Sequence, residues 1–375
     1  MRVHLVDPPA YTPPYDHALS RALGAAGADV QLITSRFAYG AVPDPDGYVR
    51  RELFYRRALG AAGSRTRRLS KLASHVPDML RYRGVARDAD VVHFQWLTTP
   101  VLDVHLLPRR PLVLTAHDLL PREPRPGQLA AQRRLLERVD AVVVHSEYGR
   151  GQLVDGLGLD PARVHVIHHG AFAHAVSGAR APLPPELTAH AGSHGRPVVL
   201  FAGLLRPYKG LDTLLDAWRR VTGAELWIAG RPMMDLGPLR ALGDDGVRWV
   251  PRFVSDGELA ALLDRADLVV LPNARTQRFD QSGVLATALA FGKPLVVTDI
   301  GGFSEIAAAG AARLVPPDDP EALSEALAEL VADPAARERL AAGALAAARA
   351  GGPFSWEAAA EATLALYARV TRQGW

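Results

Sequence analysis

The sequence predicts an α/β protein built from two doubly wound parallel sheets in tandem, and three observations support this. Short apolar runs rich in β-branched residues alternate with amphipathic stretches along the whole chain, which is typical of parallel βαβ units. The chain has 375 residues, more than one ordinary core holds. The alternation breaks once near the middle and then starts again, which indicates two domains.

The first half contains expected strands at residues 3–7, 30–34, 91–95, 112–116, 141–145 and 164–168. The second half contains expected strands at 198–203, 225–230, 247–251, 268–272, 294–299 and 312–317. Residues 171–196 between them are rich in Ala, Gly, Pro and Ser. We therefore expect a Rossmann-like domain over 1–175, a linker over 176–196 and a second Rossmann-like domain over 197–354.

The composition is that of a globular protein, with 48% hydrophobic and 22% charged residues. No stretch approaches the roughly 18 uninterrupted apolar residues of a membrane span. The N-terminus lacks the long apolar region and cleavage site of a signal peptide. The chain has no cysteine, which excludes disulfides, thiolate catalysis and cysteine-ligated zinc. We expect a cytoplasmic protein.

Positive charge is concentrated in the region 50–87, where the acidic residues are only Glu52 and Asp78. Its basic residues are Arg50, Arg51, Arg56, Arg57, Arg65, Arg67, Arg68, Lys71, Arg81, Arg83 and Arg87. This charge is compatible with a solvated helix face, with an anionic acceptor, or with peripheral contact at the inner face of a membrane. Nucleic acid is not an expected partner, because no binding motif accompanies the charge.

The loop in "FAGLLRPYKGLDTLL" has the features of a phosphate site. An expected strand ends at Gly203, Arg206 and Lys209 follow, and Gly210 opens a helix. A helix N-terminus offers free N–H groups, and a glycine there lets a ligand approach the backbone. Two cations at the positive end of a helix are unfavourable unless an anion binds between them. We therefore predict a phosphate or diphosphate site.

A second loop, in "QSGVLATALAFGKPLVV", predicts another helix N-terminus at the same edge of the second sheet. Ser282 is a plausible N-cap, and Gly283 opens an expected helix over 283–291. The carboxyl ends of parallel strands share one edge of a sheet, so both loops should face one crevice. Two helix N-termini and two cations there would stabilise a departing diphosphate without a metal ion.

These segments resemble those of glycosyltransferase family 4, a family of retaining enzymes with the GT-B fold. The second half carries the resemblance almost continuously, through "FAGLLRPYKG", "LWIAGRP", "ADLVVLP", "QSGVLATALAFGKPLVVTDIGGFSEI" and "LVPPDDPEALSEAL". The first half is similar through "LTAHD", "VVHSEYGR" and "VIHHGAF". The resemblance implies two Rossmann-like domains facing a cleft, with a C-terminal helix over 355–375 that crosses back to the first domain.

The resemblance also implies roles for individual residues. Arg206 and Lys209 would hold the donor diphosphate, and His117 would face the donor sugar. Residues near the base, ribose and transferring sugar would be Gly203, Gly230, Arg231, Arg252, Phe253, Asp280, Gln281, Ser282, Gly283, Val284 and Thr287. The co-substrate would be a UDP- or GDP-sugar and the other substrate a hydroxyl acceptor, with no cofactor and no metal. The leaving phosphate would take the acceptor's proton.

Two departures from the family pattern concern the expected site. The paired glutamates of the family fall at Phe279 and Thr287, where Asp280 is a candidate substitute for the first and the Thr287 hydroxyl for the second. The usual glycine turn after the first strand is replaced by "PPAYTPPYD" at 8–16, and prolines offer no N–H group to phosphate. This stiff loop favours acceptor contacts instead.

The candidate acceptor contacts in the first domain are Tyr15, Trp96 and Asp118. The histidines of "VHVIHHG" make zinc conceivable, but a strand leading into the hinge explains them better. Two other functions remain open: a nucleotide-sugar epimerase of the same architecture, and a catalytically silent sugar-nucleotide-binding homologue. Sparse acidic residues argue against the epimerase, which needs groups that move a proton at a sugar carbon.

Overall fold

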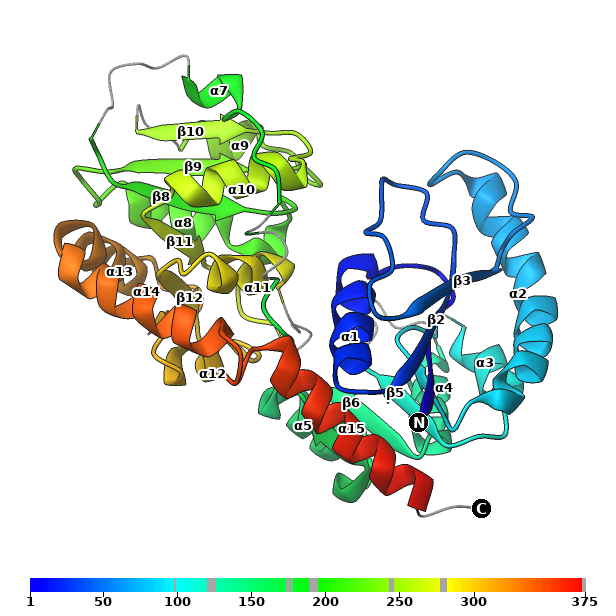
Figure 1. Cartoon of the computed structure of the whole chain (residues 1–375). Coiled ribbons are helices and arrows are strands. Elements are labelled where there is room, and N and C mark those ends of the chain that lie inside the picture. The colour runs from blue at the N-terminus through cyan, green and yellow to red at the C-terminus, as the bar shows by residue number, and fades with distance from the viewer. Residues whose placement is uncertain are drawn as a thin grey trace. The chain divides into compact units, whose positions relative to one another are not determined.

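The computed structural model contains two compact units, one formed by residues 1–169 with 356–375 and the other by residues 170–355 (Figure 1). It describes residues 1–97, 99–119, 126–172, 176, 178–188, 195–242, 246–276 and 282–372. Each unit is a parallel sheet with helices on both faces. Each therefore has two apolar layers, one on either side of its sheet.

The first unit has a seven-stranded sheet in the order β3-β2-β1-β4-β5-β6-β7. The strands are β1 (Arg2–Asp7), β2 (Asp29–Ser35), β3 (Val49–Phe54), β4 (Val91–Phe94), β5 (Leu112–Thr115), β6 (Ala141–Val144) and β7 (Val164–Val166). The strand β3 was not predicted. This strand lies at the edge of the sheet, and its charged residues Arg50, Arg51 and Glu52 interrupt the apolar pattern.

The helices of the first unit are α1 (Pro13–Ala25), α2 (Arg65–Val85), α3 (Pro100–Leu106), α4 (Gln128–Arg138), α5 (Glu147–Gly151) and α15 (Trp356–Arg372). The C-terminal helix α15 packs against α1, as the expected return of the chain requires. Its Tyr367 is buried and contacts His93 of β4, with 2.7 Å between the phenol oxygen and Nδ1. The last helix is thus part of the first unit's core.

The second unit has a six-stranded sheet in the order β10-β9-β8-β11-β12-β13. The strands are β8 (Val198–Ala202), β9 (Glu225–Ala229), β10 (Val247–Val250), β11 (Leu268–Leu271), β12 (Leu295–Thr298) and β13 (Ala312–Val315). The helices are α7 (Pro185–Thr188), α8 (Leu211–Trp218), α9 (Gly237–Arg240), α10 (Asp256–Arg265), α11 (Gly283–Ala290), α12 (Phe303–Ala308), α13 (Pro320–Ala332) and α14 (Pro334–Ala348). The strands β8, β9, β11 and β12 are buried throughout, as expected for a sheet covered on both faces.

The segment 176–196, expected to be a linker, packs on the second unit over residues 178–188. Arg180 forms an ion pair with Asp264 at 2.5 Å, and the Ala181 N–H donates to the carbonyl of Gly257. Leu187 is buried in the core of the unit. The Ala- and Pro-rich segment therefore belongs to the second unit over these residues and is not a separate linker there.

The loop after β1 is held by a buried carboxylate instead of by glycine. Asp7 accepts hydrogen bonds from the N–H groups of Tyr11 at 2.7 Å and Thr12 at 3.3 Å. Ala10 between them has a positive φ of 56°, a strained conformation for alanine. Asp16, in the first turn of α1, is buried beside Asp7. Burial raises the pKa of Asp16 well above its usual range, and the charge of Asp7 raises it further.

We predict that Asp16→Asn stabilises the protein increasingly as the pH rises from about 4 to about 8. A raised pKa in the folded state contributes stability at low pH, and this contribution is lost as the pH rises, by up to about 1.4 kcal/mol per pH unit. Asparagine is neutral beside Asp7 at every pH, whereas Asp16 must bind a proton to be neutral. The difference in Tm between variant and wild type should therefore grow with pH.

Thermal unfolding followed by circular dichroism across this pH range is the measurement. Asp44→Asn is the matched control, because Asp44 is exposed in the same unit. Parallel Tm curves for wild type and Asp16→Asn would show that Asp16 is ionised in the folded protein, against this prediction.

Candidate active site

The predicted phosphate loop follows β8 and is tied to the loop after β9. The Gly203 N–H donates to the carbonyl of Ala229, and the Leu205 N–H donates to the carbonyl of Arg231, both at 3.0 Å. Residues Pro207–Lys209 then form one 3-10 turn, and α8 begins after Gly210. The cations Arg206 and Lys209 therefore flank a short turn at the N-terminus of α8.

Glycine is required at this edge because main chains cross in contact there. Gly210 has a φ of 65°, and a Cβ atom at this position would collide with the carbonyl oxygen of Pro272, just beyond β11. Gly230 has a φ of 152°, and a Cβ atom there would collide with the carbonyl oxygen of Gly203. The three loops after β8, β9 and β11 are thus packed backbone against backbone, with no room for a side chain at either contact.

The first turn of α11 reaches the same edge. A Cβ atom on Gly203 would lie 3.4 Å from the side chain of Val284, so the two loops are in contact. Ser282 caps the helix, its side chain accepting from the N–H of Leu285 at 3.5 Å. Thr287, by contrast, is buried and its hydroxyl donates to the carbonyl of Gly283 at 2.8 Å. The hydroxyl hydrogen of Thr287 is therefore used within the helix. A ribose hydroxyl, the expected partner, could reach Thr287 only as a donor to its oxygen.

Two buried polar groups at this edge lack a hydrogen-bond partner in the part of the chain that the structure describes. One is the Nε of Arg206, and the other is the side-chain amide of Asn273, which follows β11. A buried polar group without a partner is costly, so natural proteins usually satisfy it with a bound group or water. Asn273 was missed in the sequence, although an asparagine directly after a buried strand was the available signal.

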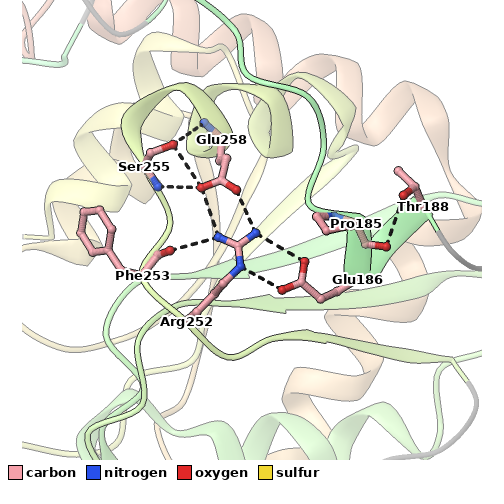
Figure 2. Close-up of polar contacts among 7 residues, drawn as sticks. All are labelled: Pro185, Glu186, Thr188, Arg252, Phe253, Ser255 and Glu258. Carbon is pink, nitrogen blue, oxygen red and sulfur yellow. Dashed lines mark hydrogen bonds and ion pairs between the residues drawn. The ribbon is translucent and has the colours of Figure 1, made fainter.

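Arg252, a predicted nucleotide contact, is paired with two carboxylates in this structure. Figure 2 shows its guanidinium between Glu186, at 2.9 Å, and Glu258, at 2.8 Å. The hydrogen bond to Arg252 lowers the pKa of Glu258 to about 2. Arg252 also donates to the carbonyl of Phe253, whose ring points away from the ion pairs and is 69% exposed. Arg252 thus fixes the loop, and Phe253 is the group left open to a ligand.

In the first unit, four neighbouring strands each place a polar side chain at their carboxyl ends. Gln95 follows β4, His117 follows β5, His145 follows β6, and His169 lies three residues beyond β7. Gln95 and His117 are in contact, with 3.0 Å between Oε1 and Nε2. His117 Nδ1 and His145 Nε2 are 3.4 Å apart. The expected donor-sugar residue His117 is therefore the middle member of a row of polar groups.

The protonation of this row follows from its ends. His145 Nδ1 lies 2.9 Å from the carbonyl of Ile167 and must donate to it. Burial lowers the pKa of His145 to about 4, so its Nε2 carries no proton at neutral pH and can accept from His117 Nδ1. Burial also lowers the pKa of His117, which leaves its Nε2 as an acceptor. All nitrogens are satisfied when the Gln95 amide turns its NH₂ group toward His117.

The aromatic residues expected to contact an acceptor are arranged differently from the prediction. Tyr15 is only 5% exposed, and its ring packs edgewise on His117, His169 and Trp356. Trp96 also stacks on His117, with 5.1 Å between ring centroids. Tyr15 therefore packs within the cluster, where little of its ring is exposed to an acceptor. The exposed ring is that of Tyr11, at 60%, which the sequence analysis did not select.

Of the remaining predicted site residues, some are exposed and others lie outside the described residues. Asp118 is exposed beside His117, and Arg231 is exposed after β9. Asp280 and Gln281, together with Phe279 at the first glutamate position, lie outside the described residues. Within the described residues, no group of three or more His, Asp or Glu side chains is arranged to hold a metal ion.

Comparison with known proteins assigns the family. Residues 196–333 match the family model of glycosyl transferases group 1, and residues 15–171 match that of glycosyltransferase family 4. A D-inositol 3-phosphate glycosyltransferase of Xylanimonas cellulosilytica is 30% identical over 95% of this chain and 90% of its own length. One from Nocardioides is 31% identical over 65% of this chain, which spans 56% of that relative.

Solved structures agree on the fold. Sucrose-phosphate synthase from Thermosynechococcus elongatus superposes with a TM-score of 0.75 and 20% identity, covering 100% of both chains. Anabaena HepE, solved in complex with UDP, superposes with a TM-score of 0.71 and 17% identity over 98% of this chain and 100% of HepE. The chain is therefore a glycosyltransferase of the GT-B type and belongs to glycosyltransferase family 4.

Proposed function

We propose that the protein is a metal-independent, retaining glycosyltransferase that moves a sugar from a nucleotide diphosphate to a hydroxyl acceptor. The observation that carries this proposal is the edge of the second sheet where the loops after β8, β9 and β11 and the first turn of α11 meet. Arg206 has an unsatisfied Nε there, and Lys209 adds a second cation. A diphosphate would satisfy Arg206 with two charge-assisted hydrogen bonds.

In the proposed reaction, the acceptor oxygen bonds to the anomeric carbon as the bond from that carbon to the phosphate oxygen breaks. The departing phosphate oxygen takes the acceptor's proton, so the enzyme needs no protein nucleophile. Negative charge develops on the diphosphate, and Arg206, Lys209 and the N–H groups at the starts of α8 and α11 stabilise it. No cofactor and no metal ion take part in this proposal.

The donor side has support from the neighbours. HepE was solved with UDP, and a further structure of it contains UDP-glucose. We propose a UDP- or GDP-sugar donor whose base lies against Phe253, next to Gly230 and Arg231. An aromatic ring that is mostly exposed beside a phosphate site is suited to stack on a base. The proposal for Asp280, that it takes over from the first family glutamate, stands on sequence alone.

The acceptor side is proposed at the carboxyl edge of the first unit. His117 would contact the donor sugar when a sugar hydroxyl replaces Gln95 at its Nε2. The exposed Tyr11 and Asp118, beside Trp96, would face the acceptor. Glycan, lipid-linked and natural-product hydroxyls all fit this description, and the names of the relatives add inositol 3-phosphate to the panel to be tested. We place the enzyme in the cytoplasm, with the 50–87 region in peripheral contact with the inner membrane face.

Nucleotide binding tests the diphosphate site directly. We predict that one of UDP, GDP and dTDP binds in calorimetric titration and that Arg206→Ala weakens this binding by roughly a hundredfold. Two charge-assisted hydrogen bonds together contribute about 3 kcal/mol, which corresponds to that factor. Arg219→Ala is the matched control, because Arg219 is exposed at the other end of α8. If folded wild-type protein binds none of the three nucleotides, the proposed donor site is wrong.

Arg252 and Phe253, which are adjacent in the loop after β10, should affect different properties. Substitution of Arg252 should lower thermal stability, and substitution of Phe253 should weaken nucleotide binding. Phe253→Ala should weaken nucleotide binding roughly threefold to tenfold, as loss of about 1 kcal/mol of stacking implies, and leave Tm unchanged. Arg252→Ala should instead lower Tm by roughly 2–4 °C, because partly exposed ion pairs contribute about 1 kcal/mol. Calorimetry and thermal unfolding of both variants are the measurements. A large loss of binding in Arg252→Ala with an unchanged Tm would restore Arg252 as a ligand contact.

Metal removal tests the remaining part of the proposal. We predict that nucleotide affinity in EDTA stays within about twofold of that in Mg²⁺ or Mn²⁺, because side-chain cations and helix N-termini replace the metal. The same comparison applies to sugar transfer once an acceptor is found. Donor incubated without acceptor is the companion assay, since conversion of the donor into an isomer would identify an epimerase. Affinity that requires a divalent ion would contradict metal independence.

A further inference from the structure

Helix α2 presents positive charge that no carboxylate of the described chain neutralises. Arginines at this helix and in the preceding loop that form no ion pair among the described residues are Arg56, Arg57, Arg65, Arg67, Arg68, Arg81 and Arg83. Asp78 is the acidic residue of α2, and its carboxylate accepts from the N–H of Tyr55 at 2.7 Å. The charge of this surface is therefore available to an external anion.

Leucines are exposed on the same surface. Leu69, Leu72 and Leu80 of α2, with Leu59 of the preceding loop, are each between 50% and 68% exposed. Leu72 and Leu80 lie three and eleven residues after Leu69, which is about one and three helical turns, so the three share one face. Ser70 holds Leu59 next to the helix: it accepts from the Leu59 N–H at 3.0 Å. The buried face of α2 is formed by His75, Met79 and Tyr82.

The position of α2 leaves this surface open. The helix lies at the outer side of its unit beside the edge strand β3 (Figure 1). It has 21 residues and begins with an N-cap, Ser64, whose side chain accepts from the Arg67 N–H. Although Pro77 lies within the helix, α2 is supported by its contacts with β3 and α3, and exposed leucines interspersed with arginine are the pattern of a helix that lies in a lipid interface.

The chemistry favours an anionic lipid surface over other occupants. A second copy of the chain would bring the same arginines against one another, which is repulsive. Nucleic acid would use the arginines but would leave the leucines in water. A bilayer surface with anionic headgroups satisfies both, because the arginines meet phosphates while the leucines enter the boundary of the acyl chains.

We propose that α2 and the loop 55–64 form an interfacial membrane-binding element, with Leu59, Leu69, Leu72 and Leu80 inserted among anionic lipids. No helix in the described ranges is long and apolar enough to cross a bilayer, and this element would lie on its surface. The inference rests on the membrane contact of the 50–87 region proposed above and deepens it by naming the residues. It is separable from the donor chemistry, because lipid binding is measured without nucleotide or acceptor.

Vesicle flotation of the whole protein is the first experiment. The probes are vesicles of phosphatidylcholine alone and vesicles in which about a third of the lipid is phosphatidylglycerol. Binding is expected to the anionic vesicles, to fall as salt is added, and to be weak on phosphatidylcholine. Protein that binds nucleotide but floats with neither vesicle would overturn the inference and leave the proposed donor site intact.

Paired variants test the two components of the surface. Arg68→Glu with Arg81→Glu should weaken vesicle binding at least tenfold, and Leu69→Ser with Leu72→Ser should weaken it by a similar factor. Matched controls are Arg219→Glu with Arg220→Glu, and Leu129→Ser with Leu242→Ser, all at exposed positions away from α2. Circular dichroism and thermal unfolding of every variant report that it is folded. Full binding by the leucine variant would overturn insertion, and equal losses in the controls would overturn the assignment to α2.

Insertion can also be observed directly, because the chain contains no cysteine. Leu72→Cys therefore gives a unique site for a polarity-sensitive fluorophore, and Leu129→Cys gives its control on α4. A blue shift of the Leu72 label with anionic vesicles, absent for the Leu129 label, is the expected result. An unshifted Leu72 label on bound protein would show that only charge attraction holds the protein, and it would overturn the insertion of the leucines.

Discussion

The candidate site depends on backbone atoms that touch one another at the carboxyl edge of the second unit's sheet. Gly210 lies against the carbonyl of Pro272, and Gly230 lies against the carbonyl of Gly203, with no room for a side chain at either contact. These two contacts bring the loops after β8, β9 and β11 together. The cations and the helix N-termini converge only because of this packing, so the electrostatics of the site follow from the absence of two Cβ atoms.

The two units differ in how their polar groups at the strand ends are satisfied. In the second unit, the Arg206 Nε and the Asn273 amide are buried without a partner among the described residues. In the first unit, Gln95, His117 and His145 form a connected row whose last member donates to a backbone carbonyl, but one atom of the Gln95 amide is buried without a partner among the described residues. A ligand at the proposed diphosphate site would satisfy polar groups that have no bond, whereas a ligand at His117 would have to replace the bond between His117 and Gln95.

The sequence predicted what depends on local pattern. Buried strands, the helix over 283–291 and the loop around Arg206 are encoded by residues close together in the chain, and they are present. Features that depend on distant partners were missed. Arg252 pairs with Glu258, six residues away, and with Glu186, 66 residues away, and the second pairing left no local signal. The strand β3 was missed for a related reason, since an edge strand needs only one buried face and can carry charge on the other.

The proline loop after β1 shows how a lost motif can be replaced by a different kind of contact. A glycine turn would offer N–H groups to a phosphate, but here the Tyr11 and Thr12 N–H groups donate to the carboxylate of Asp7. These N–H groups are therefore not available to a phosphate at this edge, and burial raises the pKa of Asp7 itself. The same bonds hold Tyr11 outward, its ring edgewise on Trp96 at 5.3 Å between centroids. The acceptor contacts proposed at this edge would therefore rest on ring faces and hydroxyl groups, which suit a polyol better than a charged group.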